Sequence, residues 1–229
     1  MKIYCICLSN RKEHCKRFFE KLDVKPVYVT PCLSKNIKMR ESTRPVPVIL
    51  GESLNVKITP EVETSNYPFV SQQYNAYPSK LACTISHRNA LHMFLHSNED
   101  TCIVFEDDNS IPSSHEINRF NYWKAWLSQN HQHFNLVNLS PCFSRRVATH
   151  ATLHPDLFAS SGFCMNCYAV SRDGARQLLE KVMTNKMHTL DHHLPFVTKS
   201  YEIHPRVFSQ NLEPSLLENP SSPPEFFGQ

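Results

Sequence analysis

The sequence predicts an α/β protein with a parallel or mixed sheet, and two stretches carry that prediction. Residues 102–105, CIVF, form an unbroken apolar run, which is typical of a strand covered on both faces. Residues 2–8 predict a first strand, residues 11–22 a helix and residues 26–30 a second strand. This order favours a parallel pair of strands joined by a right-handed crossover.

Serine and asparagine residues indicate where helices begin. Ser9 or Asn10 is expected to cap the first helix, whose apolar residues share one face. Those residues are Cys15, Phe18, Phe19 and Leu22. Ser79 is expected to cap a helix over residues 80–96, and Ser171 a helix that follows it directly.

The remaining regular elements follow from periodicity and apolar runs. Another helix is expected around residues 116–128, and residues 140–160 indicate polar, irregular structure. Further strands are expected at residues 134–139, 163–170 and 201–208.

Residues 31–78 predict an irregular insert or flap within a single domain that spans residues 1–217. Alternating apolar residues at 54–58 favour a hairpin with residues 48–50. The chain of 229 residues suits one domain with a substantial core, and residues 218–229 form a proline-rich tail.

Composition narrows the functional classes. A net charge of +3, with no run of lysine or arginine, argues against a nucleic-acid partner. No apolar stretch reaches the length of a membrane span or a signal peptide, so we expect a cytoplasmic or otherwise intracellular protein.

The nine cysteines are then expected to be reduced and mostly buried in strands. Cys164 and Cys167 form a lone CxxC, which is weak support for zinc. Four glycines cannot form a glycine-rich phosphate loop.

The most informative feature is the acidic run Glu106, Asp107 and Asp108 directly after the buried strand. Adjacent carboxylates repel one another, so keeping them ionised in a cleft requires a positive group among them. A hard divalent cation held by oxygen atoms would supply it at the carboxyl end of the strand, where α/β proteins bind ligands. A solvated acidic turn is the alternative.

The order of motifs resembles glycosyltransferase family 25, which includes bacterial lipooligosaccharide galactosyltransferases and collagen galactosyltransferases. The matching pieces are, in order, CLSNR, LACTISHRNAL, CIVFEDD, CYAVSRDGARQLL, TLDHHL, and HPRVFSQ followed by Ser215. The resemblance covers most of the chain outside the insert and the tail. Two departures are the first motif, where the family has Ile-Asn-Leu, and Ala82, where it has glycine.

The resemblance implies a GT-A-like fold with a mixed, mostly parallel central sheet flanked by helices. It implies inverting transfer of a sugar, with galactose favoured, from a UDP-sugar to a hydroxyl of a glycan or hydroxylated peptide. A divalent cation, Mn²⁺ by preference, would bridge the diphosphate and take up its charge. In an extended segment alternate side chains point the same way, so Glu106 and Asp108 could face one ion and are the expected metal ligands, with Asp107 as the reserve. The donor contacts would be Ser9, Arg11, Ser86, His87, Glu106 and Asp107.

An inverting transfer also needs a general base for the acceptor hydroxyl, and the resemblance favours Asp191. Asp191 is also a good helix cap. His87 lies on an apolar helix face and can instead be a core histidine. Arg11 can instead be a solvated arginine at the start of a helix. His204 resembles a late metal-binding position. Tyr122, Trp123 and Trp126 can stack on a sugar or pack in the core.

Two other functions stay open. The altered first motif is compatible with a glycosyltransferase-like protein that binds without catalysis. Asp191, His192 and His193 spell a tripeptide of one group of metal-dependent phosphoesterases, although the other motifs of that group are missing.

Overall fold

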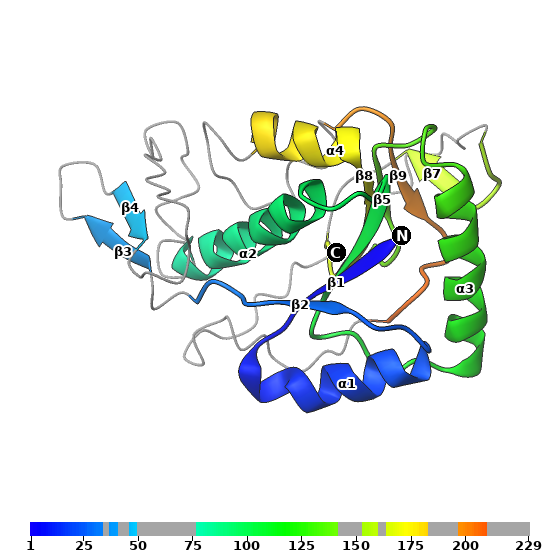
Figure 1. Cartoon of the computed structure of the whole chain (residues 1–229), viewed down its shortest axis with the longest axis horizontal. Coiled ribbons are helices and arrows are strands. Elements are labelled where there is room, and N and C mark those ends of the chain that lie inside the picture. The colour runs from blue at the N-terminus through cyan, green and yellow to red at the C-terminus, as the bar shows by residue number, and fades with distance from the viewer. Residues whose placement is uncertain are drawn as a thin grey trace, which may run out of the picture.

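The computed structural model describes residues 1–33, 37–40, 46–49, 77–141, 153–159, 164–182 and 197–209. Its centre is a seven-stranded sheet with the strand order β2-β1-β5-β8-β6-β9-β7 (Figure 1). The strands are β1 (Lys2–Ile6), β2 (Val27–Val29), β5 (Thr101–Glu106), β6 (Leu136–Asn138), β7 (Leu157–Ala159), β8 (Cys167–Ser171) and β9 (Ser200–Ile203).

The sheet is mixed, and most of its strands point the same way. Strand β1 pairs in parallel with both β2 and β5. Strand β8 runs antiparallel to its neighbours β5 and β6, while β6 and β9 are parallel. Strand β7 closes the edge antiparallel to β9. Strands β2, β1, β5, β6 and β9 therefore share one direction, which confirms the prediction of a mixed, mostly parallel sheet.

Helices cover both faces of the sheet, so the described residues form three layers (Figure 1). The helices are α1 (Lys12–Lys21), α2 (Tyr77–Leu95), α3 (Ser114–Gln129) and α4 (Arg172–Gln177), which a π-helical turn (Leu178–Val182) continues. None of the helices in the described ranges has both the length and the apolar character needed to cross a membrane.

Alternation along β5 divides the core in two. Ile103 and Phe105 pack with the buried residues of α1 and α3, whereas Cys102 and Val104 pack with those of α2 and α4. Successive side chains of a strand point to opposite faces, so an apolar run of this kind needs helices on both sides. The expected strand is confirmed, together with the reason for its unbroken hydrophobicity.

Aromatic rings fill the core on the α1 side. The ring centroid of Phe105 lies 5.6 Å from that of Phe18, 5.3 Å from Phe19, 5.9 Å from Phe120 and 5.7 Å from Phe208. Several of these pairs meet edge to face, a favourable geometry for aromatic rings. The predicted apolar face of α1 is confirmed.

The expected helix caps are correct in one case and wrong in two. The Ser171 side chain accepts a hydrogen bond from the N–H of Gly174, 3.1 Å away, and caps α4 as predicted. Ser9 and Asn10 instead belong to a 3₁₀ turn (Ser9–Arg11), and Arg11 precedes α1 without a side-chain cap. Ser79 lies inside α2, which begins earlier, at Tyr77.

Three strands differ from the sequence prediction, and one of them is β9, which ends at Ile203 instead of continuing to residue 208. Strand β7 lies in the segment expected to be irregular, because a three-residue edge strand leaves almost no periodic signal. In the insert, β3 (Ile37–Arg40) pairs antiparallel with β4 (Val46–Ile49). The expected partner at residues 54–58 and the tail at residues 218–229 lie outside the described residues.

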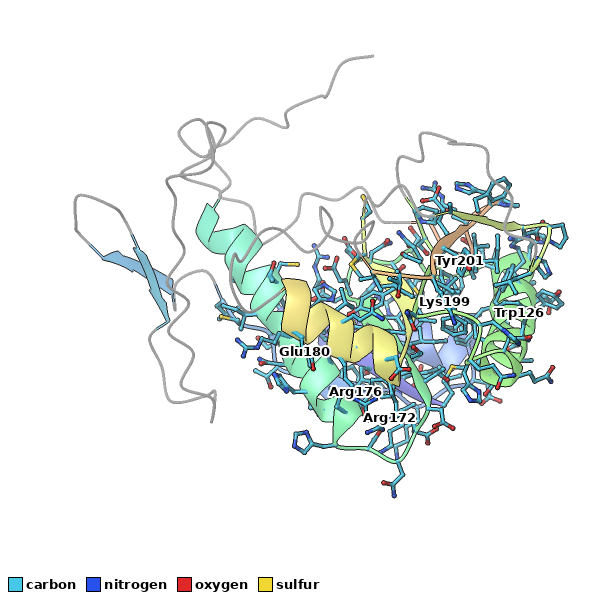
Figure 2. All side chains as sticks on the ribbon, turned by 90° about the horizontal axis from the view of Figure 1, so that it is seen from above. Trp126, Arg172, Arg176, Glu180, Lys199 and Tyr201 are labelled. Atoms are coloured by element: carbon cyan, nitrogen blue, oxygen red, sulfur yellow. The ribbon has the colours of Figure 1, made fainter. Side chains whose placement is uncertain are left out.

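Arg172 joins the start of α4 to the end of α2. Its guanidinium donates hydrogen bonds to the carbonyl oxygens of Leu95 (2.7 Å), Ser97 (2.7 Å) and Glu99 (3.0 Å). These carbonyls are at the end of α2 or just beyond it, where helix carbonyls lack intrahelical partners. Figure 2 labels Arg172 at the start of α4, close to this turn. The contact helps to fix α2 on its face of the sheet.

We expect Gly174→Ala to destabilise the fold, because α4 approaches the backbone just before β6 very closely. A Cβ atom at this position would lie 1.9 Å from the carbonyl oxygen of Asn135. The helix would have to move, at a cost of about 1–3 kcal/mol in the free energy of unfolding. Urea unfolding measures this cost. Arg176→Ala, an exposed change in the same helix, is the control, and equal effects of the two variants would contradict the prediction.

Candidate functional site

The candidate site lies where the parallel strands β1 and β5 end side by side. Ile6 is aligned with Glu106 in the strand register. The chain leaves β1 through α1 on one face of the sheet and reaches β5 through α2 on the other face. The strand order therefore changes direction between β1 and β5, and α/β proteins bind ligands in the crevice at such a point.

The first two acidic side chains after the core of β5 point to different faces. Glu106 is the last residue of the strand and follows Cys102 and Val104 toward α2. Asp107 lies in the turn that follows and contacts the segment between β1 and α1. This separation keeps the two like charges apart, which reduces their repulsion.

Glu106 is held by a buried histidine. Oε1 of Glu106 lies 2.8 Å from Nε2 of His87 and accepts a hydrogen bond from the Cys83 thiol at 3.3 Å. On the other side of the ring, Nδ1 of His87 lies 3.2 Å from the Tyr168 hydroxyl. The carboxylate can only accept, so Nε2 of His87 donates the hydrogen bond to Oε1 of Glu106.

These contacts keep Glu106 ionised although it is largely enclosed. Burial by itself would raise the pKa of Glu106, but the hydrogen bond and the charge of His87, with the Cys83 hydrogen bond, lower it overall. The Glu106 side chain is 25% exposed to solvent, while the His87 side chain is 1% exposed. A negative, partly exposed carboxylate is therefore held at the carboxyl ends of β1 and β5.

Asp107 is held by the segment that follows β1. Its Oδ2 accepts a hydrogen bond from the backbone N–H of Leu8 at 2.7 Å, and Arg11 Nη1 lies 3.4 Å from Oδ1. The side chains of this ion pair are 15% and 13% exposed for Arg11 and Asp107. Burial raises the pKa of Asp107, although the Leu8 N–H and Arg11 act in the opposite direction.

Two buried asparagines fix the acidic turn, and the sequence analysis missed both. Asn109 donates to the carbonyl oxygens of Glu106 (3.0 Å) and Asn166 (3.1 Å), and Asn166 donates back to Asn109 Oδ1 at 3.3 Å. The carbonyl oxygen of Asn109 also lies 2.8 Å from Nε2 of His14 on α1. An asparagine directly after the acidic run is the signal that could have identified Asn109, since asparagine is a preferred turn residue.

Two further predicted residues lie around this crevice. Ser86 is buried, donates to the carbonyl oxygen of Ala82 at 2.7 Å and accepts from the N–H of Cys32 at 2.8 Å, so it joins the segment after β2 to α2. Ser9 is exposed in the 3₁₀ turn after β1. Their proposed contacts with a donor stay predictions.

The expectation for Asp108 rested on an extended backbone, and that premise is wrong. Strand β5 ends at Glu106, while Asp107 and Asp108 form a turn. Alternation therefore does not place Glu106 and Asp108 on one side. Asp108 is partly buried beside the other two carboxyl groups in the chain, and its role as a metal ligand stays a prediction.

Other candidates lie away from the crevice or outside the described residues. His204 lies after β9, three positions from β5 in the sheet, and its Nε2 is 2.8 Å from Oε1 of the buried Glu202. Trp123 is buried, which confirms core packing for that residue. Tyr122 is 53% exposed and its hydroxyl contacts His154 Nε2 at 2.7 Å. Asp191 lies outside the described residues.

The cysteines follow the expectation in most cases. Seven described cysteines are free, and five of them are buried. Cys164 is disulfide-bonded, contrary to the expectation that the cysteines are reduced. Since Cys167 is free and buried, the CxxC pair does not act as a zinc-binding unit in this structure.

Two sets of side chains at the crevice have the chemistry of metal ligands. Glu106, Asp107 and Asp108 offer carboxylate oxygens, which hard divalent cations prefer. Cys83, His87 and Glu106 each bring one ligand atom to within 4.8 Å of the others, a mixed set of sulfur, nitrogen and oxygen.

The sheet, its two helical layers and the acidic turn at the strand switch define an α/β protein that binds its ligand at the carboxyl edge of the sheet. The chain belongs to glycosyltransferase family 25, since residues 1–194 match the model described as glycosyltransferase family 25 (LPS biosynthesis protein). The protein is therefore a glycosyltransferase, an enzyme that transfers a sugar from a donor to an acceptor. A search among curated proteins finds no match.

We expect His87→Ala to destabilise the protein more than Tyr168→Phe does. The first change leaves the Glu106 carboxylate without its closest partner, which should cost about 2–4 kcal/mol in the free energy of unfolding, given its partial exposure. The second removes one neutral hydrogen bond, which should cost about 1 kcal/mol. Urea unfolding at pH 7 measures both values. Equal losses would show that His87 acts through packing rather than through Glu106.

Proposed function

We propose that the protein transfers galactose, with inversion, from UDP-galactose to a hydroxyl of a glycan or hydroxylated peptide, using a GT-A-like fold. One observation carries the proposal: the carboxylates after β5 are held at the strand switch, on a frame built from β1, α1, α2 and β8. A rigid acidic site in that position suits a ligand whose own negative charge is bridged by a cation.

The carboxyl groups fit a hard divalent cation, and Mn²⁺ is the proposed ion. We assign Glu106 and Asp108 as its ligands, because both carboxylate oxygens of Asp107 already contact the Leu8 N–H and Arg11. Both contacts from α2 end on Oε1 of Glu106, and the side chain is 25% exposed, so a second partner can reach it. When bound, the cation neutralises the charge that develops on the departing diphosphate.

The segment after β1 supplies the proposed contacts to the nucleotide. Arg11 lies 3.4 Å from Asp107, a long ion pair that leaves the guanidinium able to reach a phosphate oxygen as well. Ser9 is exposed in the same turn and offers a hydroxyl. On the opposite wall, Ser86 and His87 are proposed to support the donor site through Cys32 and Glu106.

Asp191 is the proposed general base. It would accept the proton of the acceptor hydroxyl while that oxygen forms a bond to the anomeric carbon and the bond to UDP breaks on the opposite face. This displacement inverts the configuration at the anomeric carbon. Asp191 lies outside the described residues, but the family match spans it.

The two alternative functions make different predictions about chemistry. A family match over residues 1–194 favours a glycosyltransferase over a phosphoesterase built on Asp191, His192 and His193. A protein that binds without catalysis would retain UDP and metal but release no UDP from any donor sugar. Incubation with a panel of UDP-sugars and Mn²⁺, with and without glycan acceptors, separates these outcomes.

We expect UDP with Mn²⁺ to raise the melting temperature, and Asp108→Asn to abolish the part that depends on metal. Saturation at about one hundred times the dissociation constant contributes about 2.7 kcal/mol, which corresponds to about 5–10 °C for a domain of this size. Thermal-shift measurements with and without Mn²⁺ test this. Asp23→Asn, an exposed aspartate away from the crevice, is the matched control. An unchanged metal-dependent shift in Asp108→Asn would remove Asp108 from the site.

We expect Asp191→Asn to lower the rate of transfer while leaving UDP binding intact. Loss of a general base costs about 10²–10⁴-fold in rate. The rate is measured as UDP released with acceptor present, and binding as the thermal shift with UDP and Mn²⁺. A variant with full transfer activity would exclude Asp191 as the base. A variant that also loses the UDP-dependent shift would indicate a role in binding or folding.

A further inference from the structure

Three cysteines meet between β1 and α1, on the face of the sheet away from His87. Cys5 lies in β1 and Cys7 follows that strand directly, and both belong to the core layer that packs against α1. Cys15 lies on the buried face of α1 and faces them. The reverse turn that brings α1 back over β1 thus collects three sulfur atoms from an eleven-residue segment of sequence.

The separations of the sulfur atoms suit one metal ion. The Sγ atoms of Cys5 and Cys15 are 3.9 Å apart, and all three Sγ atoms lie within 4.8 Å of one another. Two thiolates bound to a tetrahedral ion at about 2.3 Å would be about 3.8 Å apart. The Cys5–Cys15 pair already has this spacing. Cys7 is half-buried in the connection that follows β1, so its side chain can adjust to complete the set.

The surroundings of the cluster favour a soft metal ion. Cys5 and Cys15 are buried among apolar side chains, at 0% and 2% exposure, and Cys7 provides access from solvent. A set of three sulfur donors selects thiophilic ions over Mg²⁺ or Mn²⁺. A single disulfide would use two of these sulfurs and leave the third unexplained, and all three are free thiols in the structure.

We propose that Cys5, Cys7 and Cys15 form a binding site for a thiophilic metal ion such as Zn²⁺, with the fourth position open on the Cys7 side. The site is separate from Cys83, His87 and Glu106, which lie on the other face of the sheet. It does not depend on the proposed sugar transfer.

The ion would lock the segment that holds Asp107. Leu8, whose N–H donates to Asp107 at 2.7 Å, directly follows Cys7. On α1, His14 contacts the carbonyl oxygen of Asn109 at 2.8 Å and directly precedes Cys15. An ion that joins Cys7 to Cys15 therefore ties together the two segments that contact the acidic turn. Its role is structural, and no bond of a substrate is made or broken at it.

A titration of the reduced full chain with Cd²⁺ tests the proposal, because thiolate binding to Cd²⁺ gives an ultraviolet charge-transfer absorption. We expect saturation at one equivalent in the presence of a competing chelator, and loss of the signal when Zn²⁺ is added in excess. Cys7→Ser is the main variant, because a hydroxyl can keep the contact of the Cys7 thiol with the Leu8 carbonyl oxygen. Its affinity should fall by more than the roughly 100-fold that loss of an outer-shell partner costs.

Two other cysteine variants serve as controls. Cys83→Ser removes the sulfur of the other potential metal-binding group, and Cys32→Ser removes a buried thiol outside both groups. Both should retain the wild-type signal. Circular dichroism confirms that each variant is folded. No absorption at one equivalent, an unchanged affinity in folded Cys7→Ser, or loss of the signal in Cys83→Ser would each overturn the proposal.

Discussion

The contact between Glu106 and His87 is the constraint on which the site depends. It joins the end of β5 to the middle of α2 at 2.8 Å, and the Tyr168 hydroxyl extends it to β8 at 3.2 Å. A buried carboxylate needs such partners, because burial without them would neutralise it. The position of α2 on its face of the sheet, which Arg172 also secures, is therefore part of the chemistry of the acidic turn.

Strand β5 and the turn that follows it direct their first two carboxylates to opposite faces of the sheet. Glu106 faces α2 and is supported by His87, whereas Asp107 faces the start of α1 and is supported by Leu8 and Arg11. The neighbouring carboxylates are thus paired with different partners, which reduces their repulsion. A cation and a diphosphate are proposed to bind beside these carboxylates, at the carboxyl ends of β1 and β5.

The connection between β1 and α1, which holds Asp107, lies next to a cluster of three cysteines. Cys7 directly precedes Leu8 and lies close to Cys5 and Cys15, and the aromatic rings around Phe105 pack in the same layer. A metal ion at the cysteines would stiffen this connection without entering the crevice. The same short connection thereby serves the sheet, the acidic turn and the proposed metal site.

Local patterns were sufficient for much of this protein, because periodicity, caps and short motifs act over a few residues. The β1–α1–β2 unit, the buried strand β5, the Ser171 cap and the acidic run were all predicted. The partners of those residues were not, since strand pairing and helix crossing join positions distant in the chain. Asn166 meets Asn109 across 57 residues, and Ser86 meets Cys32 across 54. The turn after Glu106 depends on the contacts of Asn109 with Glu106 and Asn166, and for that reason alternation could not place Asp108.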